Sequence, residues 1–349
     1  MTKIPFADIR FPADGSATLP SVETRLKEFL SKRRSDDEDI SYIDTLTSQD
    51  LDRIRWRAKA YLDACKRHSG MGHLEPSDRE LLEVLRDGVD LRMLENEHQA
   101  DEIASALHVE MPWMAAATER VWKDLRASVR RGDPGVRLSP LLLVGPPGIG
   151  KSHWARLLGQ HLSVPTTVVE ATNEPASFVV NGTQRGWSSS QPGKPLQGIL
   201  SHLVGNPVIV IDEIEKAGEV ETTKGQTYSL TAGLLPLLER STAKAWSCPY
   251  FRVTFDMSWI SWVLTANSLT GLPQPFLSRC PPLELSALTL KDLQGFAVRE
   301  GARRQLPLGA VEAVQDVVEA IKQPQLLSLR NVMRMLDAVE HSIHAPVLH

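Results

Sequence analysis

The feature that most constrains this chain is the segment LLLVGPPGIGKS at residues 141–152. A short apolar run, typical of a buried strand, leads into a turn of glycine and proline, and a Lys-Ser pair then begins an expected helix. Gly145, Gly150, Lys151 and Ser152 have the spacing of the phosphate-binding loop of nucleoside triphosphatases. The alternative is a chance glycine-rich turn, but strand, spacing and helix all agree with the loop. The segment therefore predicts an α/β fold that binds a nucleoside triphosphate.

The chemistry of the loop follows from its residue types. Glycines let backbone N–H groups curl around phosphate oxygens without a Cβ in the way. We expect Lys151 to reach the β- and γ-phosphates and the Ser152 hydroxyl to hold a magnesium ion, so that ATP and Mg²⁺ are the expected cofactors. The residues expected to bind the nucleotide are Gly145, Pro146, Pro147, Gly148, Ile149, Gly150, Lys151, Ser152 and Asp212.

Composition limits the remaining choices. The 349 residues suffice for two or three domains, and a net charge of −4 gives no overall attraction to nucleic acid or to an anionic membrane. The three cysteines lie far apart and show no metal-binding spacing. The N-terminus lacks the apolar core of a signal peptide, and no apolar run approaches the length of a membrane span. We expect a cytoplasmic protein without membrane contact.

Three regions follow from the pattern of apolar residues. Residues 1–94 are expected to be weakly ordered up to about residue 40 and helical from about Thr47, with a helix start at Ser77. In residues 95–285 the apolar runs LLLV, TTVVE, PVIVID and SWVLTAN alternate with helical stretches, which indicates a parallel sheet wrapped by helices. Three helical patterns in residues 286–349 predict a small C-terminal helical domain.

Two adjacent carboxylates end one of the expected strands. Asp212 and Glu213 follow the apolar run VIVI, about 60 residues after the phosphate loop. Such a pair suits a magnesium–ATP site, where Asp212 holds the metal through water and Glu213 polarises the attacking water. An acidic pair at the start of a surface helix is the alternative, but the fully apolar strand before it favours the functional interpretation.

Three further polar residues are candidates. Asn267 ends the strand SWVLTAN, where an amide could orient the water, although a turn asparagine is as common. Arg279 follows the last apolar stretch of the α/β region, and its guanidinium suits the charge that develops on a transferred phosphoryl group. Arg330 begins the last helix and could reach the nucleotide from the small domain. A structural ion pair for Arg279 and a solvent-facing position for Arg330 are the alternatives.

The order of these motifs resembles that of AAA+ ATPases and, within them, the ATPase module of the Lon protease family. Three stretches carry the resemblance: GPPGIGKS with the later segment GTQRGWSSSQPGK, the strand VIVIDEIEK, and PYFRVTFDMSWISWVLTANSLTGLPQPFLSRCPPLEL. The similarity covers about residues 95–345. It implies a parallel sheet with a helical lid, and a homo-oligomeric ring, most often a hexamer, with ATP at the subunit interfaces.

The resemblance also implies roles for single residues. Asn267 falls on the first sensor, Arg279 on the arginine finger and Arg330 on the second sensor, beside the catalytic Glu213. Trp187 falls on the pore-loop aromatic that grips a threaded polypeptide. The residues after it are serines, where Lon-type loops carry an aliphatic residue and a glycine, and a buried or interface aromatic is the alternative.

Together these features predict an ATPase, and they leave more than one use of the ATP energy to consider. Lon proteases continue into a peptidase domain, and the residues after Ile343 are too few to supply one, so we expect no peptidase chemistry from this chain. The favoured function is ATP-driven remodelling or unfolding of a protein partner, for a separately encoded effector or protease. The alternatives are a nucleic-acid-associated ATPase and a nucleotide-gated assembly scaffold.

Overall fold

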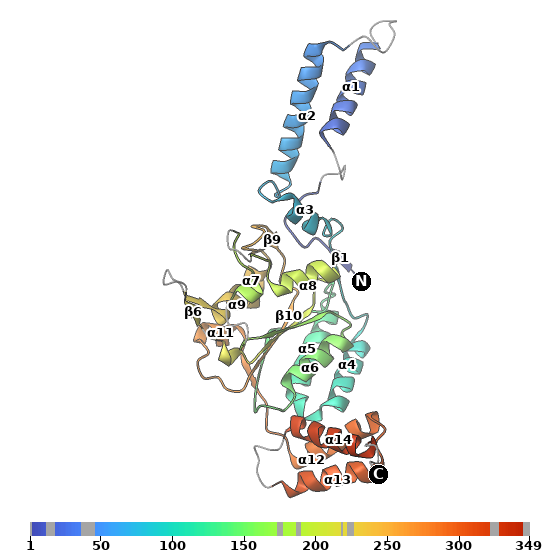
Figure 1. Cartoon of the computed structure of the whole chain (residues 1–349), viewed down its shortest axis with the longest axis vertical. Coiled ribbons are helices and arrows are strands. Elements are labelled where there is room, and N and C mark those ends of the chain that lie inside the picture. Colours follow the sequence, from blue (N-terminus) through green and yellow to red (C-terminus); the bar gives the residue numbers. More distant parts are fainter. Residues whose placement is uncertain are drawn as a thin grey trace, which may run out of the picture.

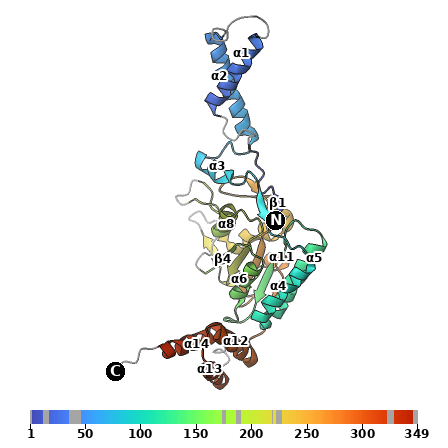
Figure 2. The ribbon, with the colours of Figure 1, turned by 90° about the vertical axis from the view of Figure 1, so that its right-hand side faces the viewer.

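The computed structural model shows an elongated molecule with three parts along its long axis (Figures 1 and 2). A helical hairpin projects at one end, an α/β body lies in the middle, and a small helical bundle lies at the other end. The structure describes residues 2–11, 18–35, 46–172, 177–185, 190–217, 219–221, 227–321 and 328–344.

The body is built on a parallel five-stranded sheet, in the order β11-β3-β10-β5-β4. The strands are β3 (Leu141–Val144), β4 (Thr166–Glu170), β5 (Val208–Asp212), β10 (Ser261–Ala266) and β11 (Pro282–Glu284). The central strands β3 and β10 are buried along their whole length. This is the continuous apolar pattern of a sheet covered on both faces. The predicted α/β fold with a parallel sheet is confirmed.

Alternate residues of the strands enter two separate cores. Leu141 and Leu143 pack with α4 (Glu97–Glu110), α5 (Ala115–Arg130) and α6 (Lys151–His161) on one face. Leu142 and Val144 pack on the other face with α8 (Lys194–His202) and α9 (Leu230–Leu238). The period of two along a strand therefore decides which residues meet which layer of helices.

The register of the sheet brings three strand ends to one edge. Val144 of β3 pairs with Ala266 of β10, and Ile211 of β5 pairs with Leu264 of β10. Polar residues that follow these strands therefore emerge close together. In an open parallel sheet this carboxyl-terminal edge is where ligands bind.

Three helices form the C-terminal bundle, which we call the lid. They are α12 (Leu290–Arg303), α13 (Leu308–Ala320) and α14 (Leu329–His344), and their apolar stripes join the core that contains α6. A capping box at Thr289 precedes α12. The Thr289 hydroxyl accepts a hydrogen bond from the Asp292 N–H, and the Asp292 carboxylate accepts one from the Thr289 N–H. The lid meets the body at the phosphate loop, where the Leu329 N–H donates to the Gly148 carbonyl at 3.1 Å.

The N-terminal residues differ from expectation. Strand β1 (Thr2–Ile4) pairs antiparallel with β2 (Val89–Leu91), and the Phe6 side chain is buried in the body core. Residues 19–35 form helix α1 (Leu19–Ser35), which packs along α2 (Ser48–His68) as the projecting hairpin. The expected weak order is therefore wrong for these described residues, because a few apolar side chains in a polar segment find partners distant in sequence.

Two smaller corrections concern the region after the hairpin. Helix α3 (Pro76–Glu83) begins at Pro76 rather than at Ser77, since proline at the first helical position needs no N–H partner. Strand β2 lies where a helical pattern was expected.

The remaining short elements are η1 (Pro112–Met114), α7 (Phe178–Asn181), η2 (Ile214–Lys216), β6 (Glu219–Glu221), β7 (Thr227–Ser229), α10 (Arg240–Ala243), β8 (Trp246–Ser247), β9 (Thr254–Phe255) and α11 (Gln274–Arg279). Among the described helices, none has the length and apolar character needed to span a membrane.

Candidate functional site

The phosphate loop connects β3 to α6 and depends on its glycines. Gly148 and Gly150 have φ values of +79° and +92°, a left-handed backbone that residues with a Cβ rarely adopt. A Cβ on Gly150 would lie 2.6 Å from the Met111 Cε and 2.9 Å from the Leu329 Cδ1. The loop is therefore fitted tightly between η1 and the lid, and α6 begins directly after it at Lys151.

The Lys151 ammonium lies at the centre of the strand ends. Its Nζ donates to the carbonyl oxygens of Gly145 at 2.7 Å and Pro146 at 3.0 Å, and to the Asn267 Oδ1 at 3.0 Å. Burial lowers the pKa of the Lys151 ammonium, while the carboxylates of Glu215, Asp212 and Glu213 act in the opposite direction. The residue thus places a buried positive charge beside the glycine loop.

Oxygen atoms from three elements, α6, β5 and β10, meet next to it. The Ser152 Oγ, in the first turn of α6, donates to the Asp212 Oδ1 at 2.6 Å, and Thr265 of β10 donates to the same oxygen. Hydroxyl and carboxylate oxygens are ligands that Mg²⁺ prefers, usually together with phosphate oxygens and water. Across the described ranges, no group of three or more His, Cys, Asp or Glu side chains could hold a metal alone. The pair therefore fits a magnesium ion that is shared with a bound nucleotide.

Glu213 lies one residue beyond the strand, in a left-handed conformation with φ of +55°. Its N–H donates to the Thr265 Oγ1 at 3.1 Å, and its carboxylate accepts from Lys216 at 2.8 Å and from Thr172 at 3.3 Å. The Lys216 hydrogen bond lowers the pKa of the Glu213 carboxyl, and a weaker bond from Asn267 acts in the same direction. The side chain is 37% exposed, so an ionised carboxylate faces the solvent at the strand edge.

Asn267 has a defined orientation because of a residue that sequence reasoning missed. Its backbone N–H and its Nδ2 both donate to the Glu215 Oε1, at 3.0 and 2.9 Å. The amide oxygen is thereby turned toward Lys151. The signal for Glu215 was present in the sequence as a third carboxylate, two residues after Glu213, but its partner lies on another strand.

These residues surround one cavity of about 520 Å³ between the sheet edge and the lid. Phe296 of α12 and Arg330 of α14 line it from the lid side. Sequence-predicted residues at this cavity are Pro147, Gly148, Gly150, Lys151, Ser152, Asp212, Glu213, Asn267 and Arg330. The volume falls in the range of about 300–1,000 Å³ that small-molecule and cofactor sites occupy.

A second residue that sequence reasoning missed supports the phosphate loop. The Trp113 Nε1 donates to the Ile149 carbonyl at 2.9 Å, and its ring packs edge-on against Phe296 with centroids 6.2 Å apart. The tryptophan thus touches both the loop and the lid. No local motif marks it, because its partners come from two other parts of the chain.

Other predicted residues do not line the cavity: Gly145, Pro146 and Ile149 belong to the phosphate loop itself, and Arg279 lies elsewhere. Arg279 lies at the end of α11, where its Nε donates to the Glu239 Oε2 at 3.2 Å and its Nη1 to the Pro275 carbonyl at 3.1 Å. It does not line the cavity within the chain. Trp187 lies outside the described residues.

Comparison with known proteins agrees with this geometry. Residues 141–285 match the sequence model of the ATPase family associated with various cellular activities (AAA). A peroxisomal Lon protease homolog 2 of Spinacia oleracea is 26% identical over 333 residues, which cover 90% of this chain and 36% of that protein. The Lon protease of Chlamydia muridarum is 32% identical over 191 residues, covering 54% of this chain and 23% of that protein.

The similarity extends beyond the matched domain but not over the whole of the relatives. This chain covers 24% of the peroxisomal Lon protease homolog 2 of Oryza sativa and 36% of the one from spinach, about a quarter to a third of their length. Sheet order, phosphate loop and family match agree on one assignment. Residues 141–285 therefore resemble the AAA family in sequence, and the chain is similar over a longer stretch to Lon proteases.

Proposed function

We propose that the chain hydrolyses ATP in the cavity between the sheet edge and the lid. The observation that carries this proposal is the meeting of Lys151, Ser152, Asp212, Glu213 and Asn267 at one edge of the sheet. Hydrolysis needs a cation for the phosphates, ligands for a magnesium ion, a base for water and a group that orients the water. All four are supplied by side chains that already contact one another.

Each residue has a role that matches its contacts. Lys151 neutralises the phosphates, and Ser152 with Asp212 holds the magnesium ion, which supplies charge neutralisation when bound. Glu213 accepts a proton from the attacking water, since its lowered pKa keeps the carboxylate ionised at neutral pH. Asn267 holds the water without adding charge. Arg330 senses the nucleotide from helix α14 of the lid, whose first residue, Leu329, donates a hydrogen bond to the phosphate loop.

The position of Arg279 supports an oligomer. Its guanidinium lies at the protein surface and away from the chain's own cavity, as a finger that acts on a neighbouring subunit requires. We propose a homo-oligomeric ring, a hexamer as in the resemblance to AAA+ ATPases. In such a ring the side chain would leave Glu239 to meet the neighbour's nucleotide.

ATP turnover then serves a protein partner. The relatives reported above are named Lon proteases, and unfolding of a protein substrate is the use of ATP that such a name suggests. We propose remodelling or unfolding of a protein, with a peptidase or other effector on a separate chain. The grip of Trp187 on a threaded polypeptide stays a prediction, and so does the cytoplasmic location.

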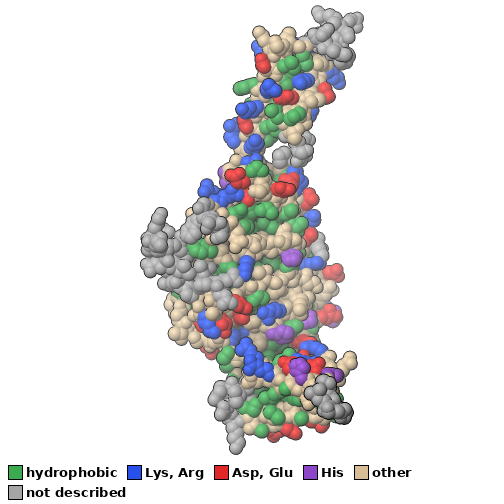
Figure 3. Space-filling view, viewed as in Figure 1, with side chains coloured by type: hydrophobic (Ala, Val, Ile, Leu, Met, Phe, Trp, Pro, Cys, Tyr) green, Lys and Arg blue, Asp and Glu red, His purple; other side chains and the backbone are tan. Residues whose placement is uncertain are grey.

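A second candidate function rests on the projecting hairpin. Trp56 on α2 is 72% exposed, and Arg53, Arg57 and Lys59 nearby are also exposed. Figure 3 shows Lys and Arg side chains along this part of the surface. Basic and aromatic side chains together suit the phosphates and bases of a single-stranded nucleic acid. A nucleic-acid-associated ATPase is therefore the alternative.

Stimulation of ATP turnover separates the two functions. The remodelling proposal expects faster phosphate release with a chemically unfolded protein and no response to single-stranded DNA. A response to DNA alone that weakens with salt would instead assign the nucleic-acid function. Light scattering with and without ATP tests the ring, and nucleotide-driven assembly without turnover would indicate a scaffold.

A further inference from the structure

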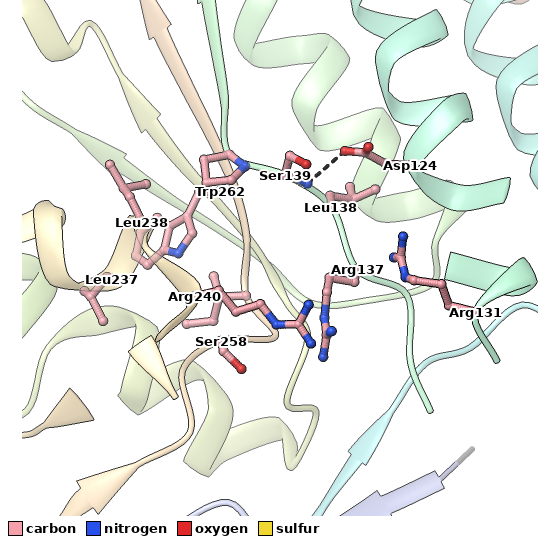
Figure 4. A pocket seen from close by; sticks show the side chains of 12 residues that line it. Asp124, Arg131, Arg137, Leu138, Ser139, Leu237, Leu238, Arg240, Ser258 and Trp262 are labelled. Atoms are coloured by element: carbon pink, nitrogen blue, oxygen red, sulfur yellow. Dashed lines mark hydrogen bonds between the residues drawn. The ribbon is translucent and has the colours of Figure 1, made fainter. Parts of the chain in front are cut away.

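A second cavity lies at the opposite edge of the sheet from the nucleotide site. It has a volume of about 330 Å³, and its lining includes Pro140 directly before β3 and Trp262 near the start of β10. Both positions are at the amino-terminal ends of their strands, whereas the phosphate loop follows the carboxyl-terminal end of β3. Figure 4 shows this cavity with the side chains that surround it.

The lining is strongly biased toward cations. It contains three guanidinium groups, from Arg131, Arg137 and Arg240, and a single carboxylate, from Asp124. That carboxylate accepts a hydrogen bond from the Ser139 N–H at 2.9 Å. Figure 4 shows that the three arginines approach the cavity from different elements. Guanidinium groups gathered around one cavity repel one another, so an anion between them would relieve the repulsion.

The arginines differ in how far the protein neutralises them. Arg131 is paired with Asp133 at 2.8 Å, whereas the closest approach of Arg137 to that carboxylate is 3.9 Å. Arg137 instead lies over the ring of Trp259, 3.8 Å from its centre. Arg240 is exposed, and the described ranges give its guanidinium no carboxylate partner. Two positive charges at the cavity therefore lack a close counter-ion.

Two buried donors at the same cavity lack acceptors. Within the described residues, neither the Arg137 Nε nor the Trp262 Nε1 has a hydrogen-bond partner, although Trp262 is only 2% exposed. A buried donor without an acceptor is costly, so such groups are rare in folded proteins. The cavity thus has more N–H donors than acceptors, and a ligand with several hydrogen-bond acceptors would satisfy them.

The rest of the wall is apolar. Leu138, Leu237, Leu238 and Ile260 face the same space. A volume near the lower limit of small-molecule sites, with cations on one part and aliphatic side chains on another, fits a compact amphiphilic anion.

We propose that this cavity binds a small phosphate monoester with an apolar portion. A phosphate monoester carries about −1.5 to −2 charges at neutral pH, which matches the two guanidinium groups without a close carboxylate. Its oxygens accept several N–H bonds in the forked geometry that arginine provides. The apolar portion packs against the leucines and Ile260. This site is separate from the ATP site and does not depend on hydrolysis there.

Calorimetric titration with phenyl phosphate tests the proposal. The titration uses the full chain with the substitution Lys151→Ala. This change removes the main phosphate-binding cation of the nucleotide loop, so the second site is measured alone. We expect one equivalent to bind, and benzoate to bind at least tenfold more weakly. Adding Arg240→Gln should weaken phenyl phosphate at least tenfold, because a charge-assisted bond is lost.

Arg67→Gln, which makes the same change at an exposed arginine in the last turn of α2, is the matched control and should leave binding unchanged. An unaltered melting temperature shows that Arg240→Gln folds. The proposal is overturned if phenyl phosphate does not bind at millimolar concentration. It is also overturned if Arg240→Gln binds as tightly as Arg67→Gln, or if benzoate binds as tightly as phenyl phosphate.

Discussion

Single residues at the carboxyl edge of the sheet hold one another in position. Glu215 fixes the amide of Asn267, Asn267 contacts Lys151, and Lys216 bonds to Glu213. The first two contacts join segments distant in sequence, and the third lies within the turn after β5. The arrangement explains why three carboxylates can lie close together, since a buried lysine and an amide separate them.

The pH dependence of turnover follows from the Lys216 contact. Because this hydrogen bond lowers the pKa of Glu213, the base stays ionised above its lowered folded value and loses function only as the pH falls through it. Lys216→Ala should raise that pKa and move the acid limb of the kcat profile to higher pH. The profile is measured between about pH 4 and 8.

Lys123→Ala provides the control, since Lys123 pairs with Glu119 on the surface of α5 and does not line the cavity. An acid limb that stays in place or moves to lower pH in Lys216→Ala would contradict the role given to this contact.

At the scale of elements, the lid and the phosphate loop are in direct contact. Gly148 has φ of +79°, and a Cβ on it would lie 2.8 Å from the Ser328 Cβ at the start of the lid helix α14. Gly148→Ala should therefore strain the loop and push the lid away. We expect ATP to bind about tenfold more weakly, which corresponds to about 1.4 kcal/mol, measured by equilibrium titration.

Gly132→Ala is the control that separates the effect of backbone strain from the effect of a clash between the added Cβ and a neighbouring residue. Gly132 also has a positive φ, of +63°, but its Cβ would meet no atom within 4 Å. The backbone penalty of about 1–2 kcal/mol is similar at both sites. An equal loss of ATP affinity in the two variants would show that the lid contact at Gly148 has no part in binding.

The elements that sequence could predict are those with a local signal. Strands β3, β4, β5 and β10 are short apolar runs bounded by turn residues, and the structure contains all four. The pairing of β1 with β2 could not be predicted, because it joins segments at opposite ends of residues 2–91 and neither has a strong pattern. Trp113 and Glu215 were missed for the same reason, since their partners are distant in sequence.

At the scale of the whole molecule, the N-terminal arm (residues 2–11) and the hairpin contribute differently to the stability of the body. Phe6 is 2% exposed and contacts Phe255 in the body core, with ring centres 5.6 Å apart. Trp56 on the hairpin is 72% exposed. Phe6→Ala should lower the free energy of unfolding of the body by about 3–5 kcal/mol, and Trp56→Ala by less than about 0.5 kcal/mol.

Urea unfolding followed by circular dichroism measures both changes. Similar losses in the two variants would mean that the arm is not part of the body core. The result also bears on the hairpin, since a surface that can change without loss of stability is free to bind a partner.

The most direct test of the account is ATP turnover by the purified chain and its Glu213→Gln variant. The wild-type protein should release phosphate from ATP in the presence of Mg²⁺. Glu213→Gln should bind ATP with similar affinity but turn it over at least about 100-fold more slowly, because only the proton acceptor is lost. Equal turnover in the two proteins would contradict the assignment of this cavity as a hydrolytic site.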